Sequence, residues 1–392
     1  MNIDKNEKLR ILGKGKTALS IKEKYQEASL FDDNDKNIYD ITSEEITVVS
    51  PGIPPHNYLV KNSKNIISDY DLFLNDSIYS IWISGTNGKT TTTQMLYQLL
   101  KEEGFGCGGN IGTPLAKIKD IDKLILETSS FTLHYTNNAK PNIYILLPIS
   151  EDHIYWHGDF KSYEDAKLKP LRNMLKSDIA IIPFKYKNIN TNAQVYYYKD
   201  TIDLAKQFEI NLGLVSFKEP FLQDAILALA VAKIYTNKID YKNINRFKQD
   251  AHKLEEFKDA KNKLWVDDSK ATNIDATINA LKVYKDKYIY LILGGDDKGV
   301  ELESLFEELK KYEVFCYFIG SNSKRLEEYA LKYDINSTKT DKIEKAVELM
   351  SKIKPSDNSV FMLSPAAASL DQFESYKHRG DQFKIFVNSF NN

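Results

Sequence analysis

Short apolar runs recur along this 392-residue chain, and most are followed by a polar or glycine-containing turn and then by a segment of helical character. The runs are residues 79–83, 124–126, 143–147, 179–182, 288–293, 314–319 and 360–363. Strands that are apolar along their whole length and separated by helices are typical of parallel sheets buried on both faces. We therefore expect an α/β protein built from mainly parallel, doubly wound sheets.

The length predicts more than one domain, since compact domains usually hold roughly 100–200 residues. A Pro/Gly-rich segment at residues 50–55 is followed by a polar stretch around Asn75, and a second change of pattern occurs near Asp250. The expected domains are residues 1–75, 76–249 and 250–392. We expect a Rossmann-like N-terminal unit, a P-loop ATPase-like central domain and a Rossmann-like C-terminal domain.

Composition argues against several classes of protein. The formal net charge is -2, from 53 basic and 55 acidic residues, so a general polyanion-binding surface and a nucleic-acid partner are not expected. Cys107 and Cys316 are the only cysteines, which argues against a disulfide framework and a thiolate zinc site. Residues 1–10 lack the apolar region of a signal peptide, and no run of about 18 apolar residues occurs. We expect a cytoplasmic protein without a membrane span.

The strongest local signal is a strand, a glycine-containing loop and a helix start at residues 81–92, which read Ile-Trp-Ile-Ser-Gly-Thr-Asn-Gly-Lys-Thr-Thr-Thr. Such a loop turns backbone N–H groups toward phosphate oxygens. Lys89 is expected to reach the terminal phosphates, and Thr90 to offer a hydroxyl oxygen to Mg²⁺. Ile83 replaces the first glycine of the usual G-x-x-x-x-G-K-[ST] pattern, so the loop is a variant. A glycine turn that merely caps a helix is the weaker alternative.

The loop Gly85-Thr86-Asn87-Gly88-Lys89-Thr90 resembles the GTNGK[ST] segment of Mur ligases and folylpolyglutamate synthases. Further segments resemble the D-glutamate-adding branch of the Mur ligase family in the same order. They are residues 108–112 (GGNIG), 127–131 (ELSSF, with Thr128 for Leu), Asp152-His153, Ala166-Lys167-Leu168, 267–273 (NDSKATN), 294–298 (GGDGK), 363–373 (LSPACASLDQF) and 379–383 (RGxxF). The resemblance covers essentially the whole chain.

The resemblance implies an ATP-dependent ligase that joins D-glutamate to UDP-N-acetylmuramoyl-L-alanine through an acyl phosphate, in peptidoglycan precursor synthesis. ATP and Mg²⁺, at two sites, are the implied cofactors, and we expect a monomer. Forming an amide in water is uphill, so ATP must activate the acid, and phosphoryl transfer needs positioned cations. The implied ATP-binding residues are Gly85, Thr86, Asn87, Gly88, Lys89, Thr90, Thr91, Asp224, Lys253, Asp268 and Lys270.

The implied catalytic residues are Lys89, Glu127, His153 and Lys167. Glu127 and His153 each follow an apolar strand, where parallel sheets place ligand groups. By resemblance Glu127 binds Mg²⁺ beside Thr90, His153 binds a second Mg²⁺, and Lys167 is carbamylated by CO₂ to become an oxygen ligand. Taken alone, Glu127 and His153 would more often have capping or surface roles.

Lys169 is the nearest competitor for the role of Lys167, but the sequence Ala166-Lys167-Leu168 favours Lys167.

In the first domain, residues 12–18 fit a G-x-G-x-x-[GA] pattern, which alone is a weak dinucleotide signal. A dehydrogenase would explain this segment but not the phosphate loop, and a turn without ligand contacts is a further alternative. By resemblance the region binds the UDP moiety. The residues implied for the UDP-linked substrate are Lys16, Thr17, Asp32, Asp33, Ser50 and Gly52, with Asn110, Ser130 and His153 from the central domain.

In the last domain, Lys298 and Ser369 follow the runs 288–293 and 360–363, where a parallel sheet presents binding loops. A dicarboxylic amino acid needs cationic and N–H partners for both carboxylates. The residues implied for D-glutamate are Thr272, Lys298, Ser369, Leu370 through its backbone, and Tyr376 where the family usually has Phe. An exposed turn lysine is the alternative for Lys298. We find no D-N-P-R signature of diaminopimelate-adding ligases.

Two departures concern the nucleotide. Asp224 replaces the second Asn of the family's H-N-x-x-N helix start, so base selectivity stays open although an adenine amino group would donate to a carboxylate. Lys253 replaces the Arg of a His-Arg pair, which keeps the charge but loses the bidentate fork.

Two other functions compete with this one: a folylpolyglutamate synthase-like amide ligase, and a nucleotide-binding homologue without catalysis. The presence of Lys89, Glu127, His153 and Lys167 argues against the second.

Overall fold

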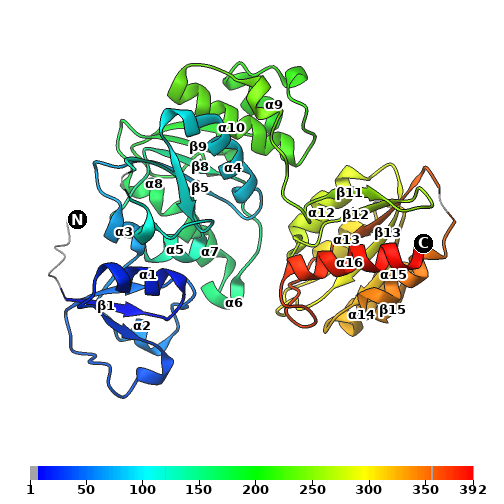
Figure 1. Cartoon of the computed structure of the whole chain (residues 1–392), viewed down its shortest axis with the longest axis horizontal. Coiled ribbons are helices and arrows are strands. Elements are labelled where there is room, and N and C mark those ends of the chain that lie inside the picture. The colour runs from blue at the N-terminus through cyan, green and yellow to red at the C-terminus, as the bar shows by residue number, and fades with distance from the viewer. Residues whose placement is uncertain (1–7, 120, 355, 392) are drawn as a thin grey trace. The chain divides into compact units, whose positions relative to one another are not determined.

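The computed structural model of the protein describes residues 8–119, 121–354 and 356–391 (Figure 1). The chain divides into two compact units, Met1–Phe247 and Lys248–Asn392. The described residues form two sheets in the first unit and one in the second. The expected α/β class with mainly parallel sheets is confirmed.

The first sheet has the order β2-β1-β3-β4, and all its strand pairs are parallel. Its strands are β1 (Leu9–Leu12), β2 (Ser29–Phe31), β3 (Ile46–Val49) and β4 (Asn65–Ile67), and its helices are α1 (Lys16–Lys24), α2 (Tyr58–Lys61) and α3 (Asp69–Phe73). Successive side chains of a strand point to opposite faces. Leu9 and Ile11 accordingly pack with α1, and Leu12 packs in a second cluster with Val49.

The central sheet has the order β10-β9-β8-β5-β7-β6 and is entirely parallel. Its strands are β5 (Tyr79–Ser84), β6 (Gly106–Gly109), β7 (Lys123–Glu127), β8 (Ile143–Leu146), β9 (Ile179–Pro183) and β10 (Gln194–Tyr198). Its helices are α4 (Lys89–Leu100), α5 (Ser130–Tyr135), α6 (Ile154–His157), α7 (Phe160–Leu168), α8 (Pro170–Asn173), α9 (Thr201–Gln207), α10 (Phe221–Thr236) and α11 (Tyr241–Ile244).

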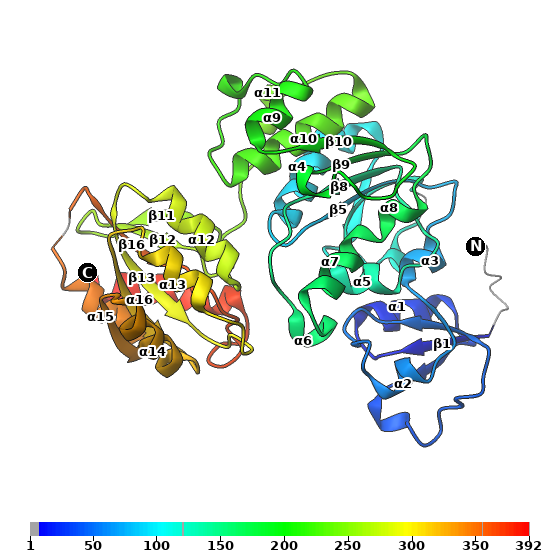
Figure 2. The same ribbon diagram turned by 180° about the vertical axis from the view of Figure 1, so that it is seen from behind.

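Helices cover both faces of the central sheet. Ile81 and Ile83 of β5 pack with α4 and α10, whereas Trp82 packs on the opposite face with α7 and α8. Both views show α5 and α6 on the side of this domain that meets the first sheet (Figures 1 and 2). Because the apolar strands are buried on both faces, the loops at their carboxyl ends are held on a rigid base.

The third sheet has the order β11-β12-β16-β13-β14-β15, in which only β11 is antiparallel to its neighbour. Its strands are β11 (Glu255–Lys258), β12 (Leu264–Asp267), β13 (Tyr288–Gly294), β14 (Val314–Ile319), β15 (Ser337–Asp341) and β16 (Ser359–Leu363). Helices α12 (Ile274–Val283), α13 (Glu303–Leu309) and α14 (Ser323–Tyr333) cover one face, and α15 (Ile343–Ser351) and α16 (Tyr376–Asn391) cover the other.

Helix α3 joins the first sheet to the central domain. Its Tyr70 ring lies 4.9 Å from the Trp82 ring in the central core, while Leu72 packs in the core of the first sheet. The carboxylate of Asp71 accepts N–H groups from the three residues 137–139, at 2.7–2.8 Å. The two sheets therefore share one compact unit, and the domain boundaries expected at residues 75 and 249 stay predictions.

Among the residues that the structure describes, no helix is long and apolar enough to cross a membrane.

The Asp71 carboxylate is buried, so its removal should be costly. We expect Asp71→Ala to lower the free energy of unfolding by about 3 kcal/mol, because three backbone N–H groups lose a charged acceptor. The measurement is denaturant unfolding followed by fluorescence. The control is Glu23→Ala, which removes an exposed ion pair with Lys117 and should cost less than about 1 kcal/mol. Equal stability of the two variants would show that Asp71 does not join the domains.

Candidate active site

The phosphate loop lies between the segment after β8 and the start of α10. Gly88 has φ +83°, and a Cβ there would lie 2.4 Å from Oδ1 of Asp224, so a side chain at this position is excluded. Thr86 joins the loop to the segment after β8. Its N–H donates to the Pro148 carbonyl at 3.1 Å, and its hydroxyl donates to the Ser150 carbonyl at 3.0 Å. The loop is thus held in one shape by the protein itself.

Two lysines donate to one carbonyl of this loop. Lys89 Nζ donates to the carbonyls of Gly85 at 3.0 Å and Thr86 at 2.7 Å, and Lys167 Nζ donates to the Gly85 carbonyl at 2.7 Å. Lys167 is only 1% exposed. Its burial, and then the charge of Lys89, hold its pKa well below the ordinary value, against the opposing charges of Asp152 and Glu127. The environment of Lys167 therefore favours a neutral amine.

Glu127 ends β7 beside the phosphate loop, and it is 2% exposed. Its Oε1 accepts a hydrogen bond from Asn110 Nδ2 at 2.7 Å. Its Oε2 is buried and has no hydrogen-bond partner among the residues that the structure describes. Burying an anionic oxygen without a partner is costly, and carboxylate oxygens are the ligands that Mg²⁺ prefers. Glu127 therefore fits a role as a Mg²⁺ ligand.

The other expected metal ligands follow neighbouring strands. Thr90 lies in the first turn of α4, after β5, and His153 precedes α6, after β8. The strands β7, β5 and β8 are adjacent in the sheet, so their carboxyl ends meet at one edge. His153 adopts φ +56°, and its ring lies 4.8 Å from the Phe131 ring and 3.5 Å (Nε2) from Oδ2 of Asp152. The sheet thus brings the expected central residues to one edge.

Asp224 lies in the first turn of α10 and is buried. Its Oδ1 accepts a hydrogen bond from the Thr92 hydroxyl at 3.0 Å, so the carboxylate rests against the phosphate loop and α4. Its expected contact with adenine stays a prediction.

Ser130 has a partner that the sequence did not indicate. Its Oγ lies 3.0 Å from Nε2 of His157, the last residue of α6. Burial, followed by the charges of His134 and Lys167, lowers the pKa of His157 to about 3. A neutral imidazole therefore orients the Ser130 hydroxyl. The sequence does show His157, four residues after His153. Its contact with Ser130 becomes evident only once α5 and α6 are known to be neighbours.

The residues of the first domain that are expected to bind UDP lie just after β1, β2 and β3, in loops or at the start of a helix. Asp32 caps a short helical turn and pairs with Lys14 at 2.6 Å, and Asp33 accepts from Asn57 Nδ2 at 2.8 Å. Lys14 and Asn57 were not among the expected residues, and each orients one of the two carboxylates. The remaining expected residues of this domain are Lys16 and Thr17 at the start of α1, buried Ser50 after β3, and Gly52.

In the C-terminal domain, the segment before β11 is joined to the loop after β12. Lys270 N–H donates to the His252 carbonyl at 3.0 Å, and Asp268 accepts from Leu254 N–H at 3.1 Å and from the Ser364 hydroxyl at 2.7 Å. Burial raises the pKa of Asp268 to about 7. These contacts join Asp268 and Lys270 to the segment 252–254, in which Lys253 lies. The expected roles of the three residues at the nucleotide stay predictions.

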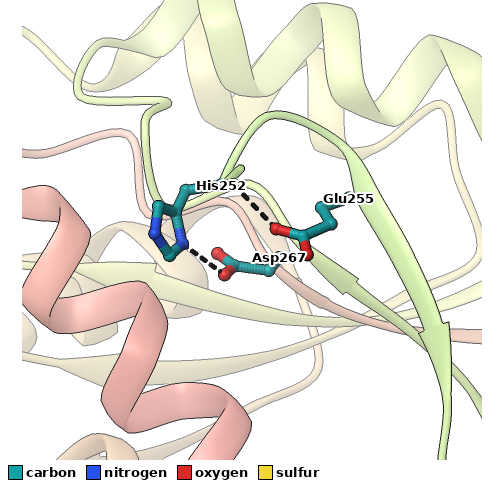
Figure 3. A group of neighbouring side chains, drawn as sticks. All are labelled: His252, Glu255 and Asp267. Atoms are coloured by element: carbon teal, nitrogen blue, oxygen red, sulfur yellow. Dashed lines mark hydrogen bonds and ion pairs between the residues drawn. The ribbon is translucent and has the colours of Figure 1, made fainter. Parts of the chain in front are cut away.

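His252, Glu255 and Asp267 form a cluster of metal-ligand type beside these contacts (Figure 3). The imidazole Nδ1 lies 2.7 Å from Asp267 Oδ2, and His252 N–H donates to Glu255 Oε2 at 2.9 Å. The ammonium of Lys384 lies 2.6 Å from the same Glu255 oxygen and 3.6 Å from Asp267. A lysine therefore already supplies the cation, and we assign the cluster a structural role.

The loops expected to hold D-glutamate are bonded to each other. Asp296 and Ala368 exchange two backbone hydrogen bonds of 2.9 Å, which places the loop of Lys298 beside that of Ser369 and Leu370. Arg379 is buried and donates to the carbonyls of Ser269 and Ala367, at 2.9 and 3.0 Å. Thr272 and Lys298 are exposed, Leu370 is exposed at its side chain, and the Tyr376 carbonyl accepts from the Ser269 hydroxyl.

Comparison with known proteins shows which family the chain resembles. Residues 83–212 match the family model of the Mur ligase middle domain. The UDP-N-acetylmuramoylalanine–D-glutamate ligase of Campylobacter jejuni (strain RM1221) is 46% identical over 401 residues, which cover 97% of this chain and 99% of that protein. The enzyme of the same name from Helicobacter pylori (strain HPAG1) is 43% identical over 419 residues, with the same coverage of 97% and 99%.

Solved structures share the fold at low sequence identity. The MurF ligase of Thermotoga maritima in complex with ADP has a TM-score of 0.60 at 16% identity, covering 97% of this chain and 94% of that one. A pseudomurein peptide ligase type C from Methanothermus fervidus has a TM-score of 0.59 at 15% identity, covering 97% and 100%. With relatives above 40% identity along nearly its whole length, the chain belongs to the Mur ligase family, in the group formed by the UDP-N-acetylmuramoylalanine–D-glutamate ligases.

Proposed function

We propose that the protein joins D-glutamate to UDP-N-acetylmuramoyl-L-alanine with ATP, as a cytoplasmic monomer in peptidoglycan precursor synthesis. The observation that carries the proposal is the edge of the central sheet, where Lys89 and Lys167 share the Gly85 carbonyl beside the buried carboxylate of Glu127. The two ligases that share 46% and 43% of their residues with this chain carry the name of this reaction.

The first step transfers a phosphoryl group. A carboxylate oxygen of the alanyl substrate attacks the γ-phosphorus of ATP, the bond to the β-phosphate oxygen breaks, and ADP leaves. Lys89 moves from the loop carbonyls to the terminal phosphates, and the backbone N–H groups of the loop bind their oxygens. Thr90 and Glu127 would hold one Mg²⁺, which neutralises phosphate charge when bound. His153 would hold a second, as the family resemblance implies.

The burial of Lys167 supports the proposal that its amine forms a carbamate. CO₂ reacts with a neutral amine, and burial in this site favours that form. The nitrogen lone pair bonds to the carbon, the amine loses a proton, and the product is an anion. Lys167 would then offer oxygen atoms beside Glu127 instead of a repelling ammonium.

The second step forms the amide. The amino group of D-glutamate attacks the acyl carbon, phosphate leaves, and the amine gives up a proton. Lys298 and the loop of Ser369 would bind the carboxylates of D-glutamate, because an ammonium and N–H donors suit these anions. Thr272, Leu370 and Tyr376 complete the proposed set. Asp224, Lys253, Asp268 and Lys270 are proposed to contact ATP, and Lys16, Thr17, Asp32, Asp33, Ser50, Gly52, Asn110 and Ser130 the UDP-linked substrate.

The direct test is phosphate release from ATP and Mg²⁺ with UDP-N-acetylmuramoyl-L-alanine. We expect release with D-glutamate, and not with L-glutamate, L-alanine or diaminopimelate, together with the amide product by mass spectrometry. Release with another amino acid would retain the family chemistry but replace the amino-acid substrate. No release with any of them, while a folate substrate is extended, would favour the folylpolyglutamate synthase alternative.

The role of Lys167 is tested by substitution. We expect Lys167→Ala to lower kcat by at least about a hundredfold, because a preorganised charged group is lost from the phosphoryl-transfer site. Short carboxylic acids such as acetate should restore part of the activity by supplying the missing oxygen ligand. Lys169→Ala is the matched control, since Lys169 Nζ donates to the His134 carbonyl outside this site, and most activity should remain. Full activity in Lys167→Ala would refute the carbamate.

A further inference from the structure

The loop after β13 carries a carboxylate directly before the lysine proposed to bind D-glutamate. Asp297 stands where the GGDGK pattern of the family has glycine, and Lys298 follows it. The Asp297 side chain is only 9% exposed, whereas Lys298 is exposed. A negative charge at this position opposes the binding of an acidic amino acid unless another group neutralises it.

Helix α14 supplies the neutralising group. Arg325 NH1 lies 3.0 Å from Asp297 Oδ2, and Asn322 Nδ2 donates to the same oxygen at 2.9 Å. The other oxygen, Oδ1, accepts from Gly299 N–H at 2.9 Å. Arg325 lies on a helix whose Leu326 and Ala330 are buried in the domain core, so the partner is held on a rigid element.

The same loop is held from its other side. Asp296 forms the backbone bridge to Ala368, and its Oδ1 accepts from Lys298 N–H at 3.0 Å. Lys298 adopts φ +52°, an uncommon backbone conformation for a non-glycine residue. The Ala368 bridge and the Asp296 carboxylate therefore hold the backbone of Lys298, and Arg325 is left to balance the charge of Asp297.

We propose that Asp297 and Arg325 are a positioning pair for the amino-acid substrate. Arg325 neutralises the Asp297 carboxylate, so that this carboxylate adds no uncompensated negative charge beside Lys298 when an acidic substrate binds. The loop itself is held by Asn322 and by the bridge to Ala368. Neither residue touches the reacting atoms. The inference rests on the proposed function, since it assumes that Lys298 binds D-glutamate.

The test compares Michaelis constants for the three substrates. Arg325→Ala should raise the KM for D-glutamate about fivefold, the effect expected from a partly exposed ion pair, and should leave kcat within about twofold. The KM values for ATP and the UDP-linked substrate should not change. Lys332→Ala is the matched control, because it removes an exposed ion pair with Glu303 from the same helix and should leave all three constants unchanged.

A second variant separates charge from packing. In Arg325→Ala/Asp297→Asn the opposing charge is absent, and we expect the KM for D-glutamate to return to within about twofold of the native value. Failure of this rescue would refute the proposed role of the pair. An equal rise of all three KM values in Arg325→Ala would refute it as well. A native KM for D-glutamate in Arg325→Ala would overturn the pair and leave the proposed function intact. A native enzyme that does not use D-glutamate would instead overturn the proposed function and, with it, this inference.

Discussion

In the central domain, one carbonyl oxygen links the phosphate loop to two helices. The Gly85 carbonyl accepts hydrogen bonds from Lys89 and from Lys167, which reach it from α4 and α7, so the phosphate loop is joined to two helices that follow different strands. Two ammonium groups on one oxygen repel each other, and burial adds to the cost of the Lys167 charge. The site is therefore arranged to lower its energy by losing a positive charge or by gaining an anion. Glu127, with one buried oxygen that no described residue binds, has the opposite need for a cation.

The sequence predicted most of the interior strands and none of the edge strands. The apolar runs correspond to β5, β7, β8, β9, β13, β14 and β16, all of which have a strand on each side. The strands β2, β4, β6, β10, β11 and β15 lie at sheet edges, where one side is open and a continuous apolar run is not required. Strand β6 reads Gly-Cys-Gly-Gly and β15 reads Ser-Thr-Lys-Thr-Asp. Three interior strands, β1, β3 and β12, were also missed: each has only four residues, and β12 ends in an aspartate.

The same division applies to the site. The local motif predicted the phosphate loop, because local order determines where a strand ends and a helix begins. The family resemblance singled out Glu127 and Lys167, whose roles stay predictions. Partners from distant segments could not be predicted. Arg325 contacts Asp297 from another helix, His157 contacts Ser130 across α5 and α6, and Lys384 reaches Glu255 from the last helix. Each pairing depends on how the helices pack, which no single stretch of sequence encodes. The sequence shows that Asp297 replaces a glycine of the family pattern. Only the structure shows that Arg325 neutralises its charge.

Helix α3 has a consequence for substrate selection. Because Asp71 and Tyr70 bind it to the central domain while Leu72 belongs to the core of the first sheet, the first sheet cannot rotate freely against the phosphate loop. The carboxyl edge of the first sheet and the edge that carries Lys89 are therefore separated by a set interval. A ligand that contacts both edges at once must therefore have a length that matches this separation. For the proposed substrate, binding of the UDP end would then determine where the carboxylate lies. An acid linked to UDP through a shorter or longer group would bind at one end and not bring its carboxylate to the phosphate.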